Sequence, residues 1–302
     1  MIKMLNKLIA SIIPIFPKKF IYIFAKKYIA GPTLDDAIKI TKDLMSKGGM
    51  STIDVLGEFV STKEMAENEL RACSKVLDAI VENHLDSNLS VKPTSLGLGI
   101  DPEYGYANIK TLLTKAKSLG LFVRLDMENS PYTTPTLDLY KRLRNDGFDN
   151  VGIVLQAYMR RSVDDVKSLI EYKPSIRLCK GIYVEPKEIA YKDREEVREN
   201  YKRLLKLMLD NGLYVGIATH DEPLIQYAEE LIKQKGMTRD QYEFQMLLGV
   251  RNERRDQLLK EGHRLRVYTP YGTDWFGYST RRLKENPKMV NDVIKSIFGL
   301  NK

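Results

Sequence analysis

Two adjacent arginines near the end of the chain form the pattern with the clearest chemical meaning. Arg281 and Arg282 are followed by Glu285, four and three residues further along. On a helix this spacing places the carboxylate beside either guanidinium. A planar guanidinium can bind a carboxylate through two parallel hydrogen bonds, and a neighbouring arginine adds a further contact. The pattern favours a clamp for a carboxylate ligand over a surface salt bridge, which would contribute only about 0–1 kcal/mol.

Eight short β-rich runs carry polar residues near their ends. The runs cover residues 51–59, 89–96, 121–128, 151–158, 176–183, 213–221, 242–249 and 263–272. In order, their ends offer Glu58, Lys92, Asp126 with Glu128, Gln156, Arg177 with Lys180, Thr219 with His220, Glu243 with Gln245, and Tyr268. Burying an unpaired charge is costly, so each charged residue needs a partner or a ligand. Any single member could be structural, but the whole set can hold a large polar ligand with anionic groups.

Stretches with helical periodicity separate these runs. The first begins with a predicted capping box from Ser61 to Glu64. The others cover residues 107–118, 134–145, 163–171, 187–210, 222–234 and 251–261. Strands that alternate with helices imply right-handed crossovers and a parallel sheet. The number of units and the length predict an α/β fold, a (β/α)8 TIM-like barrel, which typically has about 250 residues.

A doubly wound sheet is the rival fold, and its nucleotide fingerprint is incomplete here. Gly97 and Gly99 give the start of a G-x-G-x-x-G motif, but Pro102 replaces the third glycine. Only Cys73 and Cys179 are present, which excludes a disulfide scaffold and indicates a reducing compartment. With three histidines and no H-E-x-x-H or C-x-x-C motif, we expect no metal site.

The first thirty residues differ from the rest of the chain. Residues 1–30 contain six lysines and no acidic residue, whereas the whole chain carries a net charge of +8. Pro14 and Pro17 interrupt the apolar run before it reaches the roughly 20 residues of a membrane span. Two interpretations stay open: a helical segment that lies on an anionic membrane surface, or a helix that covers the bottom of the core. We expect this N-terminal helical extension to lie opposite the site, with residues 31–302 forming the barrel domain.

Six motifs, taken in order, resemble those of the proline dehydrogenase family. They are RLDMENS, QAYMRR, RLCKGIY, ATHDE, YEFQMLLG and YTPYGTDWFGYSTRRLKEN, and the resemblance runs from about Tyr28 to Asn286. It implies a distorted barrel that binds FAD without a Rossmann domain and oxidises L-proline to Δ1-pyrroline-5-carboxylate. Hydride would pass from the ring carbon next to nitrogen to flavin N5, and electrons would then pass to a membrane quinone. The length is similar to that of the monofunctional bacterial enzyme, which works beside a separate pyrroline-5-carboxylate dehydrogenase.

The resemblance also implies roles for individual residues. Asp126 and Arg177 would be catalytic, and Glu58 would pair with an active-site arginine when substrate is absent. The substrate ligands would be Lys92, Leu247, Tyr268, Arg281, Arg282 and Glu285. The cofactor ligands would be Met127, Gln156, Lys180, Gly181, Ile182, Thr219, His220 and Gln245. Ile182 and Val184 depart from the family, which often has alanine and an aromatic residue there, so flavin packing at these positions is in question.

Two alternatives compete with this interpretation. A methylenetetrahydrofolate reductase has a similar FAD barrel, but it would need a pterin-recognising acid and no pair of adjacent arginines. A basic membrane-surface or RNA-binding protein without catalysis would account for the charge but would leave the polar strand ends unexplained. On the favoured interpretation we expect no nucleic-acid partner and a cytoplasmic location, with peripheral contact at the inner face of the cell membrane.

Overall fold

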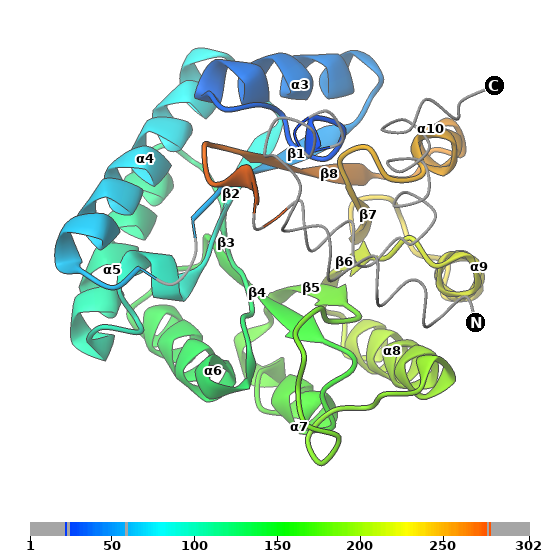
Figure 1. Cartoon of the computed structure of the whole chain (residues 1–302). Coiled ribbons are helices and arrows are strands. Elements are labelled where there is room, and N and C mark those ends of the chain that lie inside the picture. Colours follow the sequence, from blue (N-terminus) through cyan, green and yellow to red (C-terminus); the bar gives the residue numbers. More distant parts are fainter. Residues whose placement is uncertain (1–21, 23–24, 58–59, 277, 279–302) are drawn as a thin grey trace, which may run out of the picture.

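Eight parallel strands close into a barrel in the order in which they occur along the chain (Figure 1). The structure is a computed structural model, and it describes residues 22, 25–57, 60–276 and 278. The strands are β1 (Met50–Val55), β2 (Ser87–Val91), β3 (Val123–Leu125), β4 (Val151–Gln156), β5 (Ser175–Cys179), β6 (Tyr214–Ala218), β7 (Tyr242–Leu247) and β8 (Leu265–Tyr271). The pairing of β1 with β8 closes the barrel, with Ile53 opposite Thr269. The predicted (β/α)8 barrel is confirmed.

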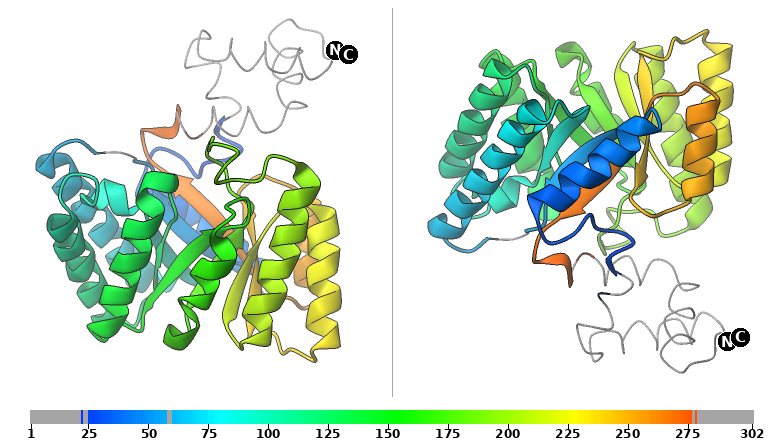
Figure 2. Two further views of the ribbon diagram at one scale, coloured as in Figure 1. Left: turned by 90° about the horizontal axis from the view of Figure 1, so that it is seen from below. Right: turned by 90° about the horizontal axis from the view of Figure 1, so that it is seen from above.

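Helices form an outer layer around the strands (Figure 2). They are α3 (Leu34–Ser46), α4 (Lys63–Glu82), α5 (Pro102–Ser118), α6 (Ser130–Asn145), α7 (Ser162–Lys167), α8 (Arg194–Asp210), α9 (Glu222–Gln234) and α10 (Asn252–Lys260). Two short 3-10 helices, η2 (Pro93–Leu96) and η3 (Ile170–Tyr172), interrupt the connections after β2 and α7. Buried leucine, isoleucine and valine side chains fill the space between the strands and the helices.

Two of the predicted helix starts were wrong. The capping box from Ser61 to Glu64 does not form, because Thr62 is the N-cap of α4 and accepts a hydrogen bond from Met65 N at 3.2 Å. Ser61 instead donates to the sulfur of Met65. The helix expected from residue 187 begins only at Arg194, after a loop that follows β5.

The inside of the barrel is polar along part of its length. Arg124, Glu243 and Arg266 are all more than nine-tenths buried there. Arg124 donates to the carbonyl oxygens of Ile153 and Ser175, and burial followed by repulsion from Arg177 lowers its pKa to about 9. The strands must therefore make room for long charged side chains where most barrels carry branched apolar ones.

The described part of the N-terminal segment lies at the carboxyl ends of the strands. Tyr28 and Ile29 are buried in one cluster with Leu56, which follows β1, and Tyr268 packs against that cluster. Ala30 N donates to the carbonyl oxygen of Pro270 on β8 at 2.8 Å. The expectation that the segment lies at the opposite end from the site is therefore wrong for these residues. In the part of the chain that the structure describes, no helix is long and apolar enough to cross a membrane.

Candidate active site

The carboxylate of Asp126 is the centre of a polar network at the carboxyl end of the barrel. Asp126 follows β3, and its Oδ1 accepts hydrogen bonds from Ser90 Oγ and from Arg177 Nη1, both at 2.6 Å. Its Oδ2 accepts from the Tyr268 hydroxyl at 2.9 Å. Burial, and then the nearby carboxylates, raise the pKa of Tyr268 well above its ordinary value, so this hydroxyl keeps its proton and donates. Strands β2, β5 and β8 thus bring three donors to a carboxylate that follows β3.

Arg177, on β5, is held at two of its nitrogens and leaves the third without a partner. Its Nε donates to Gln245 Oε1 at 2.6 Å, while Nη1 donates to Asp126 and, at 3.2 Å, to Ser90. The guanidinium carbon lies 5.2 Å from the centroid of the Tyr268 ring, within the range of a cation–π contact. The side chain is only 7% exposed, yet Nη2 has no hydrogen-bond partner among the described residues. A buried N–H without an acceptor is costly, so this nitrogen marks a place where a ligand could complete the network.

The network continues from Gln245 towards the inside of the barrel. Gln245 Nε2 donates to Glu243 Oε1 at 2.6 Å. Arg266 Nε donates to both oxygens of Glu243, at 2.9 and 3.1 Å. Burial opposes ionisation of Glu243, but the attraction and hydrogen bonds of Arg266 outweigh it and lower the pKa of the carboxyl. The site therefore rests on a buried ion pair between β7 and β8.

Lys92, at the end of β2, forms a buried ion pair with Asp54 on β1. Its Nζ lies 2.8 and 3.0 Å from the two carboxylate oxygens. Burial raises the pKa of Asp54 to about 6, although the charge of Lys92 opposes this rise. The carboxyl group of Asp126 adds to the rise by repulsion, which places both acids in one electrostatic neighbourhood. If Lys92 binds a substrate carboxylate, as predicted, that carboxylate would have to share the ammonium group with Asp54.

Gln156 and Met127 lie on the neighbouring strand ends. Gln156, the last residue of β4, donates from Nε2 to the carbonyl oxygen of Glu128 at 2.9 Å. The carboxylate of Glu128 in turn accepts from the backbone N–H of Thr94 at 3.0 Å and from its hydroxyl group. Met127, which lies between Asp126 and Glu128 in the sequence, has a buried side chain. These contacts fix the loop after β3, where a cofactor ring was predicted to contact the backbone.

Three cations converge on Asp221 beside the loop that follows β5. Lys180 Nζ lies 3.1 Å from its carboxylate, and Arg194 and Arg198 reach it at 3.3 and 2.7 Å. Burial opposes ionisation of Asp221, but the bonds from Arg198 and the charge of Lys180 outweigh it and lower the pKa below the ordinary range. Because Lys180 and Arg194 are partly exposed, their charges remain available to an anionic ligand.

The residue after Lys180 lies so close to a neighbouring ring that it cannot carry a side chain. Gly181 has φ +104°, and a Cβ atom there would lie 2.2 Å from the ring of Tyr158. Only glycine combines that conformation with that contact. The next predicted cofactor residue, Ile182, is 44% exposed, and Val184 is 98% exposed. Two apolar side chains thus stand exposed beside the charged group around Asp221.

Thr219 and His220 follow β6 but face different neighbours. The Thr219 hydroxyl accepts from the backbone N–H of Asp221 at 3.1 Å. His220 Nε2 accepts from the backbone N–H of Leu247 at 2.9 Å, and this bond joins the end of β6 to the end of β7. His220 and Asp221 are adjacent, and in an extended segment adjacent side chains point to opposite faces.

The structure brings the predicted residues of seven strands, β2 to β8, to the carboxyl end of the barrel. Asp126, Arg177, Gln245 and Tyr268 form one hydrogen-bonded network, and Lys180 with Thr219 forms a second group around Asp221. Leu247 is half-buried at the end of β7. Four predicted positions lie outside the described residues: Glu58, Arg281, Arg282 and Glu285.

Sequence reasoning missed three acceptors and donors of these networks, Asp54, Ser90 and Asp221. Ser90 lies two residues before Lys92 on β2, so the two-residue period of a strand could have placed both on the inner face. Asp54 lies on β1, four residues before Glu58, and nothing in the local sequence distinguishes it as a partner of Lys92. Asp221 has no local signal either, because its three cations come from α8 and from the residue after β5.

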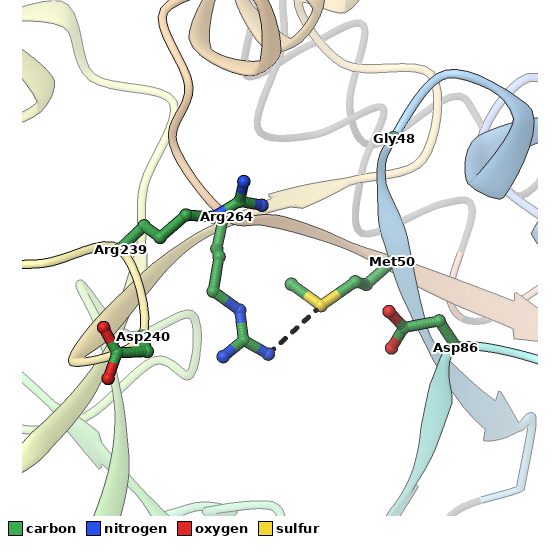
Figure 3. A pocket seen from close by; sticks show the side chains of 6 residues that line it. All are labelled: Gly48, Met50, Asp86, Arg239, Asp240 and Arg264. Carbon is green, nitrogen blue, oxygen red and sulfur yellow. Dashed lines mark hydrogen bonds between the residues drawn. The ribbon is translucent and has the colours of Figure 1, made fainter.

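A separate hollow lies at the amino ends of the strands, away from this network. Its volume is about 380 Å³, and Figure 3 shows its lining residues, which are Gly48, Met50, Asp86, Arg239, Asp240 and Arg264. Arg264 Nη2 donates to the sulfur of Met50 at 3.4 Å (Figure 3). At this end of a barrel, side chains usually serve stability.

A group with metal-binding residue types also lies at the amino ends. Glu229, Glu261 and His263 have ligand atoms within 4.8 Å of one another. Arg254 donates to both oxygens of Glu229, at 2.8 and 2.7 Å, and to Glu261 at 3.1 Å. The guanidinium of Arg254 thus already occupies oxygens of both carboxylates.

A closed barrel of eight parallel strands, with charged and amide side chains gathered at the carboxyl ends of the strands, defines a (β/α)8-barrel enzyme. Comparisons with known proteins identify the family. Residues 37–295 match the sequence model described as Proline dehydrogenase, and the chain belongs to the proline dehydrogenase family. The protein is therefore an oxidoreductase, and not a non-catalytic basic protein. Its membership of the proline dehydrogenase family also decides against methylenetetrahydrofolate reductase.

Individual relatives agree with this assignment. The chain is 39% identical over 273 residues to proline dehydrogenase 1 of Bacillus subtilis subsp. natto, covering 90% of each chain. It is 36% identical to proline dehydrogenase of Deinococcus radiodurans over 90% of this chain and 89% of that one. A crystal structure of proline utilization A from Bdellovibrio bacteriovorus, inactivated by N-propargylglycine, superposes with a TM-score of 0.82 at 24% identity. That match covers 92% of this chain but only 34% of the larger protein, so it supports the fold alone.

Proposed function

We propose that this proline dehydrogenase uses FAD to oxidise L-proline to Δ1-pyrroline-5-carboxylate and passes the electrons to a membrane quinone. The observation that carries the proposal is the buried Nη2 of Arg177, which has no partner among the described residues, at the mouth of a barrel that belongs to this family. In the reaction, the ring carbon next to nitrogen loses hydrogen with its electron pair, the nitrogen loses a proton, and a C=N bond forms. FAD, when bound, supplies the two-electron acceptor that this step requires.

The residues at the mouth fit such a cofactor. Lys180 and Arg194 offer exposed positive charge for a diphosphate beside the glycine at position 181, where the backbone permits close approach. Arg177 offers a buried donor and a positive charge to the ring system. Gln156, Gln245 and Met127 would line the ring. Ile182 would lie with Lys180 and Gly181 at the phosphates, and Thr219 and His220 would serve the adenosine end.

The substrate would lie between the flavin and β8. The ring of Tyr268 presents a flat face whose hydroxyl is tied to Asp126, so its orientation is fixed before substrate arrives. Leu247 would supply an apolar wall for the proline ring. Lys92, Arg281 and Arg282, the last supported by Glu285, would bind the carboxylate, and Glu58 would balance an arginine in the absence of substrate. Asp126 would hold Arg177 and Tyr268 in place.

The remaining parts of the proposal concern partners and location. A monofunctional chain would release its product to a separate pyrroline-5-carboxylate dehydrogenase. A membrane quinone requires contact with a bilayer, and the six lysines of residues 1–30 suit the inner face of the cell membrane. We propose a cytoplasmic protein that docks peripherally and binds no nucleic acid.

An absorption spectrum of the purified protein tests the cofactor and the substrate together. We expect one FAD per chain, and bleaching of the flavin band when L-proline is added without oxygen or quinone. A yellow protein that ignores proline but is reduced by NADH would contradict the proposal. D-proline at the same concentration is the matched control, since its carboxylate projects from the opposite face of the ring.

A further inference from the structure

The side-chain amide of Gln245 lies between a cation and an anion. Its Oε1 accepts from Arg177 Nε, and its Nε2 donates to Glu243 Oε1, both at 2.6 Å. If the amide were reversed, its NH2 group would face the guanidinium and its oxygen would face the carboxylate. Both contacts would be repulsive, so Arg177 and Glu243 together fix which end of the amide meets Arg177.

Glu243 is itself held firmly and lies too deep to touch a ligand at the mouth. It is only 2% exposed, and Arg266 Nε binds both of its oxygens. The hydroxyl of Tyr214 donates to its Oε2 at 3.1 Å. Of the three described side chains that bond to Glu243, Gln245 is the one that also bonds to Arg177.

The bond from Gln245 limits how Arg177 can meet Asp126. A guanidinium prefers to grip a carboxylate through two parallel N–H···O bonds. Here Nε is engaged by Gln245, only Nη1 reaches Asp126, and Nη2 has no partner in the part of the chain that the structure describes. Without the Gln245 amide, the guanidinium of Arg177 could rotate and donate to the Asp126 carboxylate from two nitrogens. Nη2 would then no longer be available to a ligand.

We propose that Glu243 is a positioning residue, which acts through the amide of Gln245 to keep Arg177 from closing on Asp126. The Nη2 donor of Arg177 then stays available to an electron-rich atom of the ligand at the mouth. This inference rests on the proposed function, in which that ligand is FAD.

Gly216 on β6 supports the inference independently. A Cβ atom there would lie 2.4 Å from Gln245 Nε2 and 2.9 Å from its Cδ. Glycine inside a strand weakens it, and it often marks a place where another group approaches closely. Strand β6 thus lacks a side chain at the point where the amide passes between its two charged partners.

The test compares FAD affinity in Glu243→Gln and in wild-type protein, measured by flavin fluorescence on dilution of the full-length holoprotein. A neutral residue at 243 removes the charge that anchors the NH2 group of Gln245, so the amide holds Nε of Arg177 less firmly. We expect FAD to bind about ten- to a hundredfold more weakly, the effect of losing one charge-assisted hydrogen bond. Tyr214→Phe is the matched control: it removes a bond to the same carboxylate but not the one to Gln245, and should leave affinity within about threefold.

A double-mutant cycle with Arg177→Met separates positioning from a general structural effect. If Glu243 acts through Arg177, Glu243→Gln should change FAD affinity no further in the Arg177→Met background. An undiminished effect there, or unchanged affinity in the single variant, overturns the inference.

If Glu243→Gln does not fold, Gly216→Ala displaces the same amide without removing a charge and must weaken FAD binding equally. A wild-type protein that takes up FAD but ignores proline contradicts only the proposed function, whereas one that takes up no FAD overturns both.

Discussion

Replacing Glu69 by glutamine should change the free energy of unfolding by an amount that depends on pH. Compared with wild type at the same pH, the variant should gain stability as the pH rises from 5 to 8. Glu69 lies on α4 beside the buried Asp54–Lys92 pair, and its Oε1 accepts a weak hydrogen bond from Cys73 Sγ at 3.8 Å. Burial, opposed by Lys92 and reinforced by Asp54, raises the pKa of this carboxyl from 4.5 to about 7. The folded protein thus holds a proton that the unfolded chain releases.

The sign and size of the effect follow from linkage. A carboxyl whose pKa is raised in the folded state favours folding fully below its unfolded pKa, and this contribution is lost as pH rises through the folded pKa. For a shift from 4.5 to about 7, the loss between pH 5 and pH 8 is about 2.5 kcal/mol. Glutamine does not titrate, so Glu69→Gln should remove this loss and leave any cost of burying the amide independent of pH.

Urea unfolding at pH 5, 6, 7 and 8, at one fixed FAD concentration, measures this difference. Glu67→Gln is the control, because Glu67 is exposed on the same helix and pairs only at 3.8 Å with Arg71. It should shift stability by less than about 1 kcal/mol at every pH. If the free energies of unfolding of Glu69→Gln and wild type differ equally at pH 5 and pH 8, the reasoning about the buried carboxyl is refuted.

Two further predictions concern the carboxylate clamp and the N-terminal segment. Arg281→Met or Arg282→Met should raise KM for proline about ten- to a hundredfold in steady-state assays while FAD stays bound, and unchanged kinetics in both variants would exclude the clamp. Deleting residues 1–17 should reduce pelleting with anionic vesicles and slow turnover with a lipid-embedded quinone, while turnover with a soluble dye changes little; equal vesicle binding by both forms would end the docking hypothesis.

The fold could be predicted from the sequence because strand and helix signals alternate without interruption. Runs such as VGIVLQAY combine branched apolar residues with a polar end, and β4 forms there over Val151–Gln156. Helix starts were less predictable, because neighbouring hydroxyl residues compete as caps. Thr62, and not Ser61, adopts the extended backbone that lets its side chain reach Met65 N.

The site could be predicted as a set of strand-end residues, but its pairings could not. Asp126 and Arg177 lie 51 positions apart, and their 2.6 Å bond depends on how β3 and β5 are staggered around the barrel. The three cations on Asp221 come from β5 and α8, so no local pattern in the sequence announces them. Register and stagger are properties of the closed sheet, and a strand's own residues fix only which side faces inward.

The polar interior links the stability of the barrel to the chemistry at its mouth. A buried ion pair such as that of Glu243 and Arg266 can often be replaced by apolar residues of similar volume at little cost to stability. Here it fixes the amide of Gln245, and that amide fixes Nε of Arg177. Nη2 of Arg177 is then left without a partner among the described residues. An unsatisfied buried donor lowers the stability of the unliganded protein, and a ligand that accepts its hydrogen bond recovers that free energy on binding. In the proposed function, the buried ion pair of Glu243 and Arg266 thus orients the side chains that would bind a ligand at the mouth.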